Sequence, residues 1–358
     1  MTSLDLFCQE NLKKITAAGK LRQLKNDEQQ ELISFASNDY FGLSKHPKVL
    51  EAAQLALSTS GFGERSARLV SGNNHYHQKL EAELANYKNT EAALVFGSGY
   101  LASFGVVAAL MSKSDLIIAD KFAHACLLDG ARLSGAKLLR FKHLDYQHLA
   151  ELLIKERANY QNCLIITETV FSMDGDKTDF EQIFALAKKH QAWVLSDDAH
   201  GIGLAKMPEN FADHIQLGTM SKGLGCYGGY ICASQKLIAL MQNQARSFIY
   251  TTALPSPIIA AARQALALLK DDLSISKKLQ NNIKFFSQKS GLANHGTPIF
   301  KKEFSTISDM QKAAEKLLEA GFLVGAIRPP TAPTPRLRIS ISAAHTVDQL
   351  EGLVSLTS

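Results

Sequence analysis

Residues 163–199, CLIITETVFSMDGDKTDFEQIFALAKKHQAWVLSDDA, contain the repeating unit that decides the fold of this chain. An apolar run, CLIITETV, is followed by a helical pattern, DFEQIFALAKKH, and then by a second apolar run, AWVLSDDA. Strands as apolar as these are typical of a sheet that is covered on both faces, and a helix between two of them joins parallel neighbours. The stretch therefore predicts an α/β fold.

The same alternation extends along the chain in both directions. It begins near residue 90 with AALVFGS, DLIIAD and KLLRFKH, and it continues beyond residue 199 with HIQLGTM and GGYICAS. These runs predict a mostly parallel seven-stranded sheet. After Thr252 the longer helical stretches and shorter strands predict a smaller C-terminal α+β domain. We expect a helical arm over 1–40, a large domain over 41–245 and the smaller domain over 246–358.

Composition narrows the class of protein. The 358 residues are 46% hydrophobic and 20% charged, which is typical of a globular protein, and the net charge of +5 is scattered without a basic run, so no nucleic-acid partner is expected. Residues 94–111 carry no charge, yet their three glycines favour a buried strand and helix over a membrane span. The five cysteines form no C-x-x-C pair, which argues against a metal site. The chain shows no signal-peptide pattern, so we expect a cytoplasmic protein that is not associated with a membrane.

Polar residues follow five of the predicted strands. They stand in GSGY (97–100), KFAHA (121–125), ETVFSMDG (168–175), SDDAHG (196–201) and GTMSK (218–222). Ligands of open parallel sheets bind beyond the carboxyl ends of the strands, so we expect one crevice lined by these segments. GSGYLA also fits a nicotinamide-dinucleotide motif, but only Asp115 or Asp120 loosely meets the acid that this motif requires. A tight turn, or an anion site at a helix start, explains the glycines as well.

Asp197, Asp198 and His200 offer a second set of polar side chains, with carboxylates and imidazole that suit a divalent metal. Successive strand residues face opposite sides of the sheet, so Asp197 and Asp198 cannot readily share one ion. A single inward-facing acid instead suits a cationic partner such as a protonated pyridine nitrogen. For Asp198 we expect a turn-capping role.

Lys222 is the one charge in LGTMSKGLGCYGG (217–229). Removal from water makes a lysine amine nucleophilic, and the hydroxyls of neighbouring residues can bind a phosphate. An ordinary lysine on the surface, with its amine in water, would require neither the glycine-rich loop nor these hydroxyls. Pyridoxal phosphate requires an amine for its aldehyde, an acid for its ring nitrogen, a phosphate cup and a flat face for its ring. These four roles are filled by Lys222, by Asp197, by the Gly99 and Tyr100 amides with Thr219, and by His124.

At these positions the chain resembles the α-oxoamine synthases, fold-type I pyridoxal-phosphate enzymes that condense an amino acid with an acyl thioester and release carbon dioxide. The resemblance covers nearly the whole chain, through SNDYFGL, RLVSGN, HQKLE, SGY, DKFAHACLLDGARLSG, TETVFSMDGD, DDAHGIG, TMSKGLG, YTTALP and SAAHT. AIRPPTAP (326–333) is most similar to the biotin-pathway branch, which uses L-alanine and a pimeloyl thioester. Sister branches that use glycine with acetyl or succinyl thioesters are the alternative, followed by a nicotinamide oxidoreductase and a non-enzymatic pyridoxal-phosphate carrier.

The resemblance implies a role for each matching residue. Lys222 would bind the cofactor covalently, Asp197 would pair with its ring nitrogen and His124 would stack on its ring. Ser172 and His200 would contact its phenolic oxygen, and its phosphate would be held by Gly99, Tyr100 and Thr219, with Thr251 or Thr252 of a second subunit. Arg22, Thr331 and Arg336 match substrate-binding positions, and Arg336 is the expected carboxylate clamp. The implied partners are a second copy of the chain, L-alanine and a thioester of coenzyme A or acyl carrier protein.

The chain departs from the family pattern in three places. GERSA (63–67) replaces the usual GSGGS and would put Glu64 and Arg65 near the expected substrate entrance. The interval between Asp197 and Lys222 is shorter than usual, and APTPRLR lacks the customary glycine. We therefore expect altered acyl-chain preference and an altered lid, with the cofactor residues unchanged.

Overall fold

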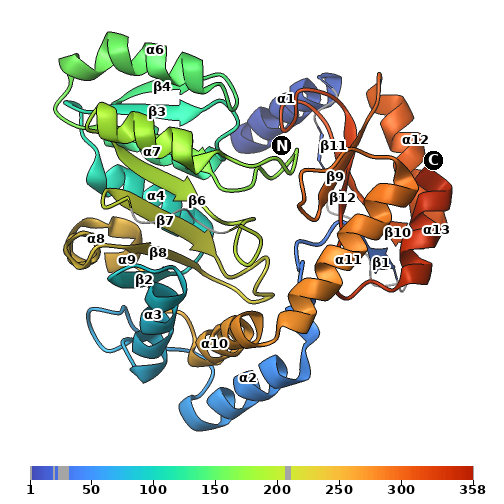
Figure 1. Ribbon diagram of the computed structural model, residues 1–358, viewed down its shortest axis with the longest axis horizontal. Helices are drawn as coiled ribbons and strands as arrows, with labels where there is room; N and C mark the ends of the chain where they lie inside the picture. Colours follow the sequence, from blue (N-terminus) through green and yellow to red (C-terminus); the bar gives the residue numbers. More distant parts are fainter. Residues whose placement is uncertain (1, 19–20, 23–31, 206–210, 358) are drawn as a thin grey trace.

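The computed structural model describes residues 2–18, 21–22, 32–205 and 211–357. A large sheet with its helices forms one side of the molecule, and a smaller sheet with three helices forms the other (Figure 1). The loops at one edge of the large sheet face the smaller part (Figure 1). The junction between the two parts is therefore where a site built from strand ends can lie.

The large sheet has seven strands in the order β2-β8-β7-β6-β5-β3-β4, and six of them run parallel while β8 runs antiparallel to β2 and β7. This confirms the predicted fold class. The strands are β2 (Ala92–Phe96), β3 (Leu116–Asp120), β4 (Lys137–Phe141), β5 (Cys163–Glu168), β6 (Trp193–Asp197), β7 (His214–Thr219) and β8 (Gly229–Ala233).

Helices cover both faces of this sheet, as the apolar strands predicted. On one face Leu164 and Leu195 pack in a cluster with residues of α4 and α5, and on the other Ile165 and Val194 pack with residues of α6 and α7. The helices of this part are α2 (Pro47–Ser60), α3 (His75–Tyr87), α4 (Gly99–Leu110), α5 (Ala125–Ser134), α6 (Tyr146–Glu156), α7 (Phe180–Lys189), α8 (Gln235–Gln244) and α9 (Arg246–Ile249), with short 3₁₀ turns η1 (Leu43–Lys45) and η2 (Arg157–Asn159).

Local sequence explains where the helices begin. Side chains of Ser98, Asp145, Asp179 and Ser234 accept hydrogen bonds from backbone N–H groups of the first turns of α4, α6, α7 and α8. Such caps satisfy donors that a helix start leaves unpaired. Residues 94–111 divide between β2 and α4, as predicted. Among the described helices, none is both long and apolar enough to cross a membrane.

The smaller part contains an antiparallel sheet in the order β11-β12-β9 and a two-stranded parallel sheet of β1 and β10. Its strands are β1 (Ile33–Ser34), β9 (Ile299–Glu303), β10 (Phe322–Leu323), β11 (Gly325–Ile327) and β12 (Arg336–Ser340), and its helices are α11 (Leu273–Ser290), α12 (Ile307–Glu319) and α13 (Val347–Thr357). The α+β character matches the prediction.

The predicted domain limits at 40 and 245 stay predictions. Helix α10 (Ser256–Asp271) packs on α2 and α3, beside the large sheet, although we assigned it to the C-terminal domain. Strand β1 lies within the predicted N-terminal arm but pairs with β10. Helix α1 (Ser3–Ala17), capped by Thr2, forms the first part of the predicted arm and has no buried residue.

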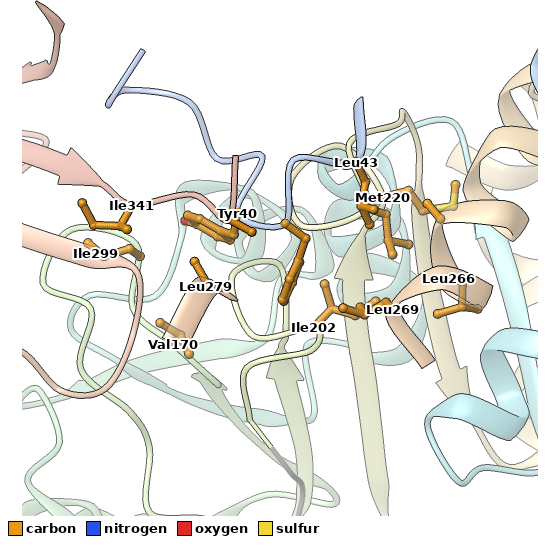
Figure 2. Close-up of a cluster of buried hydrophobic side chains, with 14 of the residues drawn as sticks. Tyr40, Leu43, Val170, Ile202, Met220, Leu266, Leu269, Leu279, Ile299 and Ile341 are labelled. Atoms are coloured by element: carbon orange, nitrogen blue, oxygen red, sulfur yellow. The ribbon is translucent and has the colours of Figure 1, made fainter. Parts of the chain in front are cut away.

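One hydrophobic cluster joins the two parts of the molecule. Figure 2 shows Val170, Ile202 and Met220, from loops of the large sheet, in the same cluster as Ile299 and Ile341 of the smaller part. All five side chains are buried. Because Val170, Ile202 and Met220 each lie within two residues of a predicted site residue, this core holds the loops of the site in place.

Candidate active site

Lys222 lies in the loop between β7 and β8, and its side chain is half-buried at the wall of a cavity. Its Nζ is 2.9 Å from Nε2 of His200. Burial lowers the pKa of the Lys222 amine, while the carboxyl groups of Asp197 and Glu168 act in the opposite direction. The loop therefore holds an amine whose neutral form, the nucleophilic one, is favoured.

His200 connects Lys222 to Tyr40. Its Nδ1 lies 2.6 Å from the Tyr40 hydroxyl, and Nη2 of Arg338 is 3.3 Å from the same hydroxyl. Burial holds the pKa of His200 well below its ordinary value, and the positive charges of Lys222 and Arg338 lower it further. A neutral imidazole has one donor and one acceptor nitrogen, so the ring orders Tyr40 and Lys222 with respect to each other.

Two buried acids, which we call the acid floor, lie close enough to this amine to interact with its charge. Asp197 and Glu168 are paired residues at the ends of the neighbouring parallel strands β6 and β5. Oδ1 of Asp197 accepts a hydrogen bond of 2.8 Å from the Ala199 N–H, and Oε1 of Glu168 is buried without a hydrogen-bond partner among the described residues. Burial raises the pKa of both groups, and for Glu168 the charge of Asp197 adds to the effect.

This floor fits a cationic group. A protonated ring nitrogen placed over Asp197 would offset the burial of its negative charge. Our sequence analysis did not identify Glu168 as a site residue. The available signal was an acid in TETVF at the end of the strand next to the one that carries Asp197.

Asp198 faces the other side of the sheet, as the strand period predicted. Its carboxylate forms a buried ion pair with Lys88, at the end of α3. The turn-capping role that we predicted for this side chain is therefore wrong, because the carboxylate is paired with a lysine. Asp197 and Asp198 diverge, so they do not form a shared metal site.

The start of α4 and the end of β7 meet at one place. A Cβ atom on Gly99 would lie 3.0 Å from Cβ of Thr219, which explains the need for glycine. Oγ1 of Thr219 is 2.7 Å from Oγ of Ser221, and the Tyr100 hydroxyl donates to Asp129. Backbone N–H groups at the start of a helix, beside two hydroxyls, are a suitable cup for a phosphate.

A cavity of about 960 Å³ opens over Lys222. Six of the predicted site residues line it: Arg22, His124, Ser172, His200, Lys222 and Thr331. Nη2 of Arg22 lies 3.4 Å from Oγ1 of Thr331, so the N-terminal arm and the loop between β11 and β12 meet at the cavity. Loops of β3, β5, β6 and β7 therefore contribute to one crevice together with the smaller part.

Arg336, the arginine predicted to clamp a substrate carboxylate, does not line this cavity. Arg336 is 1% exposed, and its guanidinium is paired with Asp174 at 2.8 Å and Glu303 at 3.0 Å. Arg338 lines the cavity instead, where its Nε donates to the Ser172 carbonyl at 2.6 Å. Arg336 and Arg338 lie on the same face of β12, so the two-residue period of the strand could not tell which of them faces the cavity. The contact of Arg336 with Asp174 distinguishes the two.

Two further predictions fall outside this cavity. Thr251 and Thr252 line a separate small recess near Arg68, and their predicted role across a subunit interface stays a prediction. Glu64 does not line the cavity either: it accepts a hydrogen bond of 2.9 Å from the Ser256 N–H and so caps α10. The position near the substrate entrance that we expected for Glu64 stays a prediction. The shortened interval before Lys222 includes residues 206–210, which lie outside the described residues.

The donor set fits pyridoxal phosphate. A lysine amine with a lowered pKa, a buried acid pair with an unpartnered oxygen, and a helix start beside Thr219 match the aldehyde, the ring nitrogen and the phosphate in turn. A seven-stranded, mostly parallel sheet with this site at its strand ends defines a fold-type I transferase.

Comparison with known proteins gives the family. The chain belongs to the aminotransferase class I and II family, which matches residues 30–356. It is 43% identical over 373 residues to a putative 8-amino-7-oxononanoate synthase of Acidiphilium cryptum (99% of this chain and 98% of that protein). It is 42% identical over 368 residues to the 8-amino-7-oxononanoate synthase of Methylobacterium radiotolerans (99% and 97%).

Solved structures agree with this assignment. Serine palmitoyltransferase of Sphingomonas wittichii superposes with a TM-score of 0.88 at 26% identity, covering 99% of this chain and 96% of that one. 8-Amino-7-oxononanoate synthase of Francisella tularensis superposes with a TM-score of 0.77 at 28% identity, covering 92% and 97%. The predicted resemblance is thus confirmed at full length.

Proposed function

We propose that this protein is a pyridoxal-phosphate-dependent acyltransferase of biotin synthesis. It condenses L-alanine with a pimeloyl thioester to give 8-amino-7-oxononanoate, carbon dioxide and the free thiol. The observation that carries the proposal is the Lys222 amine, which is hydrogen-bonded to His200 and interacts electrostatically with the buried pair of Asp197 and Glu168. The full-length similarity to relatives named for this reaction supports it.

The cofactor would be held by Lys222, by Asp197, and by the start of α4 with Thr219. When bound, it supplies an aldehyde that joins amines covalently and a ring that accepts electrons from a substrate carbon. Asp197 keeps that ring protonated, because it is the one acid on this face of β6.

Lys222 acts as the base toward the amino acid. Burial lowers the pKa of its amine, which favours the neutral, basic form, and we assign it the removal of the proton from the α-carbon of L-alanine. His200, fixed by Tyr40, orients the Nζ atom of Lys222 and contributes no charge of its own. The α-carbon would then form a bond to the acyl carbonyl carbon as the thiolate leaves, and the carboxylate that came from L-alanine would leave as carbon dioxide. Lys222, which holds the proton taken from the α-carbon, would return it to that carbon.

Arg338 is the group that we assign to the substrate carboxylate. It lies in the cavity wall, and its guanidinium has the planar donor geometry that suits a carboxylate. Hydrogen bonds to the Ser172 carbonyl, the Tyr40 hydroxyl and Oγ of Ser340 hold it in position. Arg336 cannot take this role because two acids already occupy its donors.

The acyl donor is a thioester carried by coenzyme A or by acyl carrier protein. A cavity of about 960 Å³ has room for a chain of the pimeloyl type beside the cofactor. Arg22 and Thr331, which meet over it, are the proposed contacts to the donor. AIRPPTAP forms the wall on the side of the smaller part through residues 330–333.

We also propose a homodimer, located in the cytoplasm. Phe62 and Val70 are each 81% exposed in the segment that precedes α3, and Leu4 and Phe7 of α1 are 68% and 64% exposed. Exposed apolar side chains in such number favour an interface. A second copy would also bring its Thr251 or Thr252 to the phosphate, as the family resemblance implies.

A substrate matrix tests the function. Glycine, L-alanine and L-serine are each combined with acetyl, succinyl, pimeloyl and palmitoyl thioesters of coenzyme A and of acyl carrier protein, and thiol release is measured. L-Alanine with a pimeloyl thioester is expected to react fastest. A fastest reaction with glycine and an acetyl or succinyl thioester would instead assign a sister enzyme, and no release with any pair would contradict the proposal.

A further inference from the structure

His143 follows β4 and lies between two loops of the candidate site. One loop runs from Asp120 to His124 after β3, and the other runs from Glu168 to Asp176 after β5. We propose that His143 is a positioning residue: it bridges these loops through two carboxylates and so fixes His124 and Ser172 over the reacting groups. The role rests on the proposed function, because it concerns the two loops that would hold the cofactor and the substrate.

Both ring nitrogens of His143 are bonded to acids. Nδ1 lies 2.9 Å from Oδ1 of Asp120, and Nε2 lies 2.9 Å from Oδ2 of Asp176. Asp120 is fully buried and belongs to the first loop, while Asp176 ends the second. One imidazole therefore joins two acids that are more than fifty residues apart in the sequence, with β4 and β5 between them in the chain.

The chemistry of this bridge requires a charged ring. An ionised carboxylate only accepts hydrogen bonds, and a neutral imidazole has a single N–H, so it can serve only one of the two acids. Both bonds form together when both nitrogens carry protons. His143 is thus an imidazolium placed between two carboxylates, an arrangement of charge-assisted hydrogen bonds.

The faces of the same ring contact the cavity wall. The ring of Phe122 lies 4.3 Å from that of His143, and the ring of Phe171 lies 4.4 Å away at an edge-on angle of 87°. Phe122 and Phe171 both line the cavity, and they lie two residues before His124 and one residue before Ser172. A shift of His143 would therefore move the two aromatic side chains next to the predicted cofactor contacts.

Other charged groups surround the bridge. Nε of Arg140 donates to the Asp120 carbonyl at 3.1 Å, and the Tyr146 hydroxyl accepts a bond from the Asp179 N–H close by. Burial lowers the pKa of His143, but the hydrogen bonds and charges of Asp120 and Asp176 outweigh it and raise the pKa to about 9. Because this value is raised, the bridge is complete near pH 7 and is lost as the pH rises through about 9.

Two variants and a matched control separate positioning from general stability. H143Q has an amide whose two N–H donors lie on a single nitrogen, so it cannot replace a ring that bonds one carboxylate through each of two separate nitrogens. D176N replaces one acid with an amide that can donate to a neutral imidazole, so both links survive without the ring charge. H148Q is the control: His148 lies on the neighbouring helix α6, is also half-buried, and its Nδ1 accepts from the Lys142 N–H rather than from the loops of the site.

The first measurement needs no turnover. In the cofactor-free protein, ¹⁵N spectra of the His143 imidazole should show both nitrogens protonated at pH 7.5 and a titration near pH 9. Pyridoxal phosphate, followed by its visible absorbance, should bind H143Q about tenfold or more weakly than wild type, since a charge-assisted link is lost. D176N should bind less weakly than H143Q, and H148Q should match wild type.

Kinetics of the loaded enzyme give the second readout. Wild-type kcat/KM should decline above pH 9, and this alkaline limb should be absent in D176N, whose bridge no longer needs the proton. A deprotonated His143 nitrogen at pH 7.5, or cofactor affinity in H143Q equal to wild type, would overturn the inference. If the substrate matrix gives no turnover while the cofactor affinities follow the expected order, the proposed reaction fails and the positioning role stands.

Discussion

The amine of Lys222 lies 2.9 Å from Nε2 of His200, and the two side chains come from loops that follow adjacent parallel strands. The sheet therefore sets this distance through β6 and β7, whose pairing runs from Val194 and His214 to Asp197 and Leu217. Because rigid strands fix both loops, the reacting amine is positioned before any ligand enters.

Replacing Lys222 tests the covalent link to the cofactor. K222A should lack the yellow, borohydride-reducible chromophore, and its activity should fall by a factor of about 10²–10⁴ or more because the base is lost. Absorbance spectra before and after borohydride measure the first effect, and thiol release measures the second. K236A, at an exposed lysine of α8, is the control and should match wild type. A reducible chromophore that persists in K222A would contradict the assignment.

The two arginines of β12 should give different phenotypes. R338A should raise KM for L-alanine by a factor of about 100, since losing a charged hydrogen-bonding partner costs about 2–5 kcal/mol. R336A should instead lower the free energy of unfolding, because it removes a fully buried guanidinium and leaves the largely buried Asp174 with Lys301 as its remaining cationic partner. Steady-state kinetics and urea unfolding separate the two effects. A raised KM in R336A with wild-type stability would return the carboxylate role to Arg336.

Stability should decrease on acidification from pH 6.5. Burial lowers the pKa of both His77 and His345 to about 4, so each is neutral in the folded protein at pH 5. The unfolded chain binds these protons below pH 6.5, which costs about 1.4 kcal/mol per pH unit for each histidine until the folded pKa is reached. Urea unfolding at pH 7 and pH 5 measures the slope.

Two variants isolate the contribution of one histidine to that slope. H345Q should make the pH dependence shallower by about 1.4 kcal/mol per unit, whereas H295Q, at an exposed position, should leave it unchanged. Equal slopes in wild type and H345Q would show that His345 does not titrate as expected.

If the proposed homodimer forms through the segment that contains Phe62, a charge at Phe62 should disrupt it and a charge at Leu273 should not. F62E places a charge at a side chain that is 81% exposed, and it should convert the dimer to a monomer and reduce activity. L273E changes a side chain that is 74% exposed at the start of α11, away from this segment, and should leave both properties unchanged. Light scattering after size-exclusion chromatography measures the mass, and a monomeric wild type would contradict the interface.

The large sheet could be predicted from the sequence because each strand is an apolar run and each helix between the strands has a clear period. It also located Lys222, His200 and Asp197, since each follows a strand end, and strand ends of a parallel sheet share one edge. The position of Asp197 relative to Asp198 followed from the two-residue period.

Other features depend on contacts between distant segments, which a local pattern does not contain. Arg336 and Arg338 have the same residue type and the same strand face, and only the position of Asp174, in a loop of the large sheet, distinguishes them. The contact of Glu64 with the start of α10 could not be predicted because the two are almost two hundred residues apart. Glu168 was missed because its significance depends on the strand beside it.

The core that joins the two parts has a consequence for how the protein is made. Tyr40 and β1 pack against segments near the end of the chain: Ser340 donates its N–H to the Phe35 carbonyl, and Ile33 pairs with Phe322. A nascent polypeptide leaving the ribosome cannot complete these contacts until almost the whole chain has emerged. Premature termination after residue 320 would therefore expose Val170, Ile202 and Met220 and yield a product suited to chaperone binding or degradation, with no arginine at the place of Arg338.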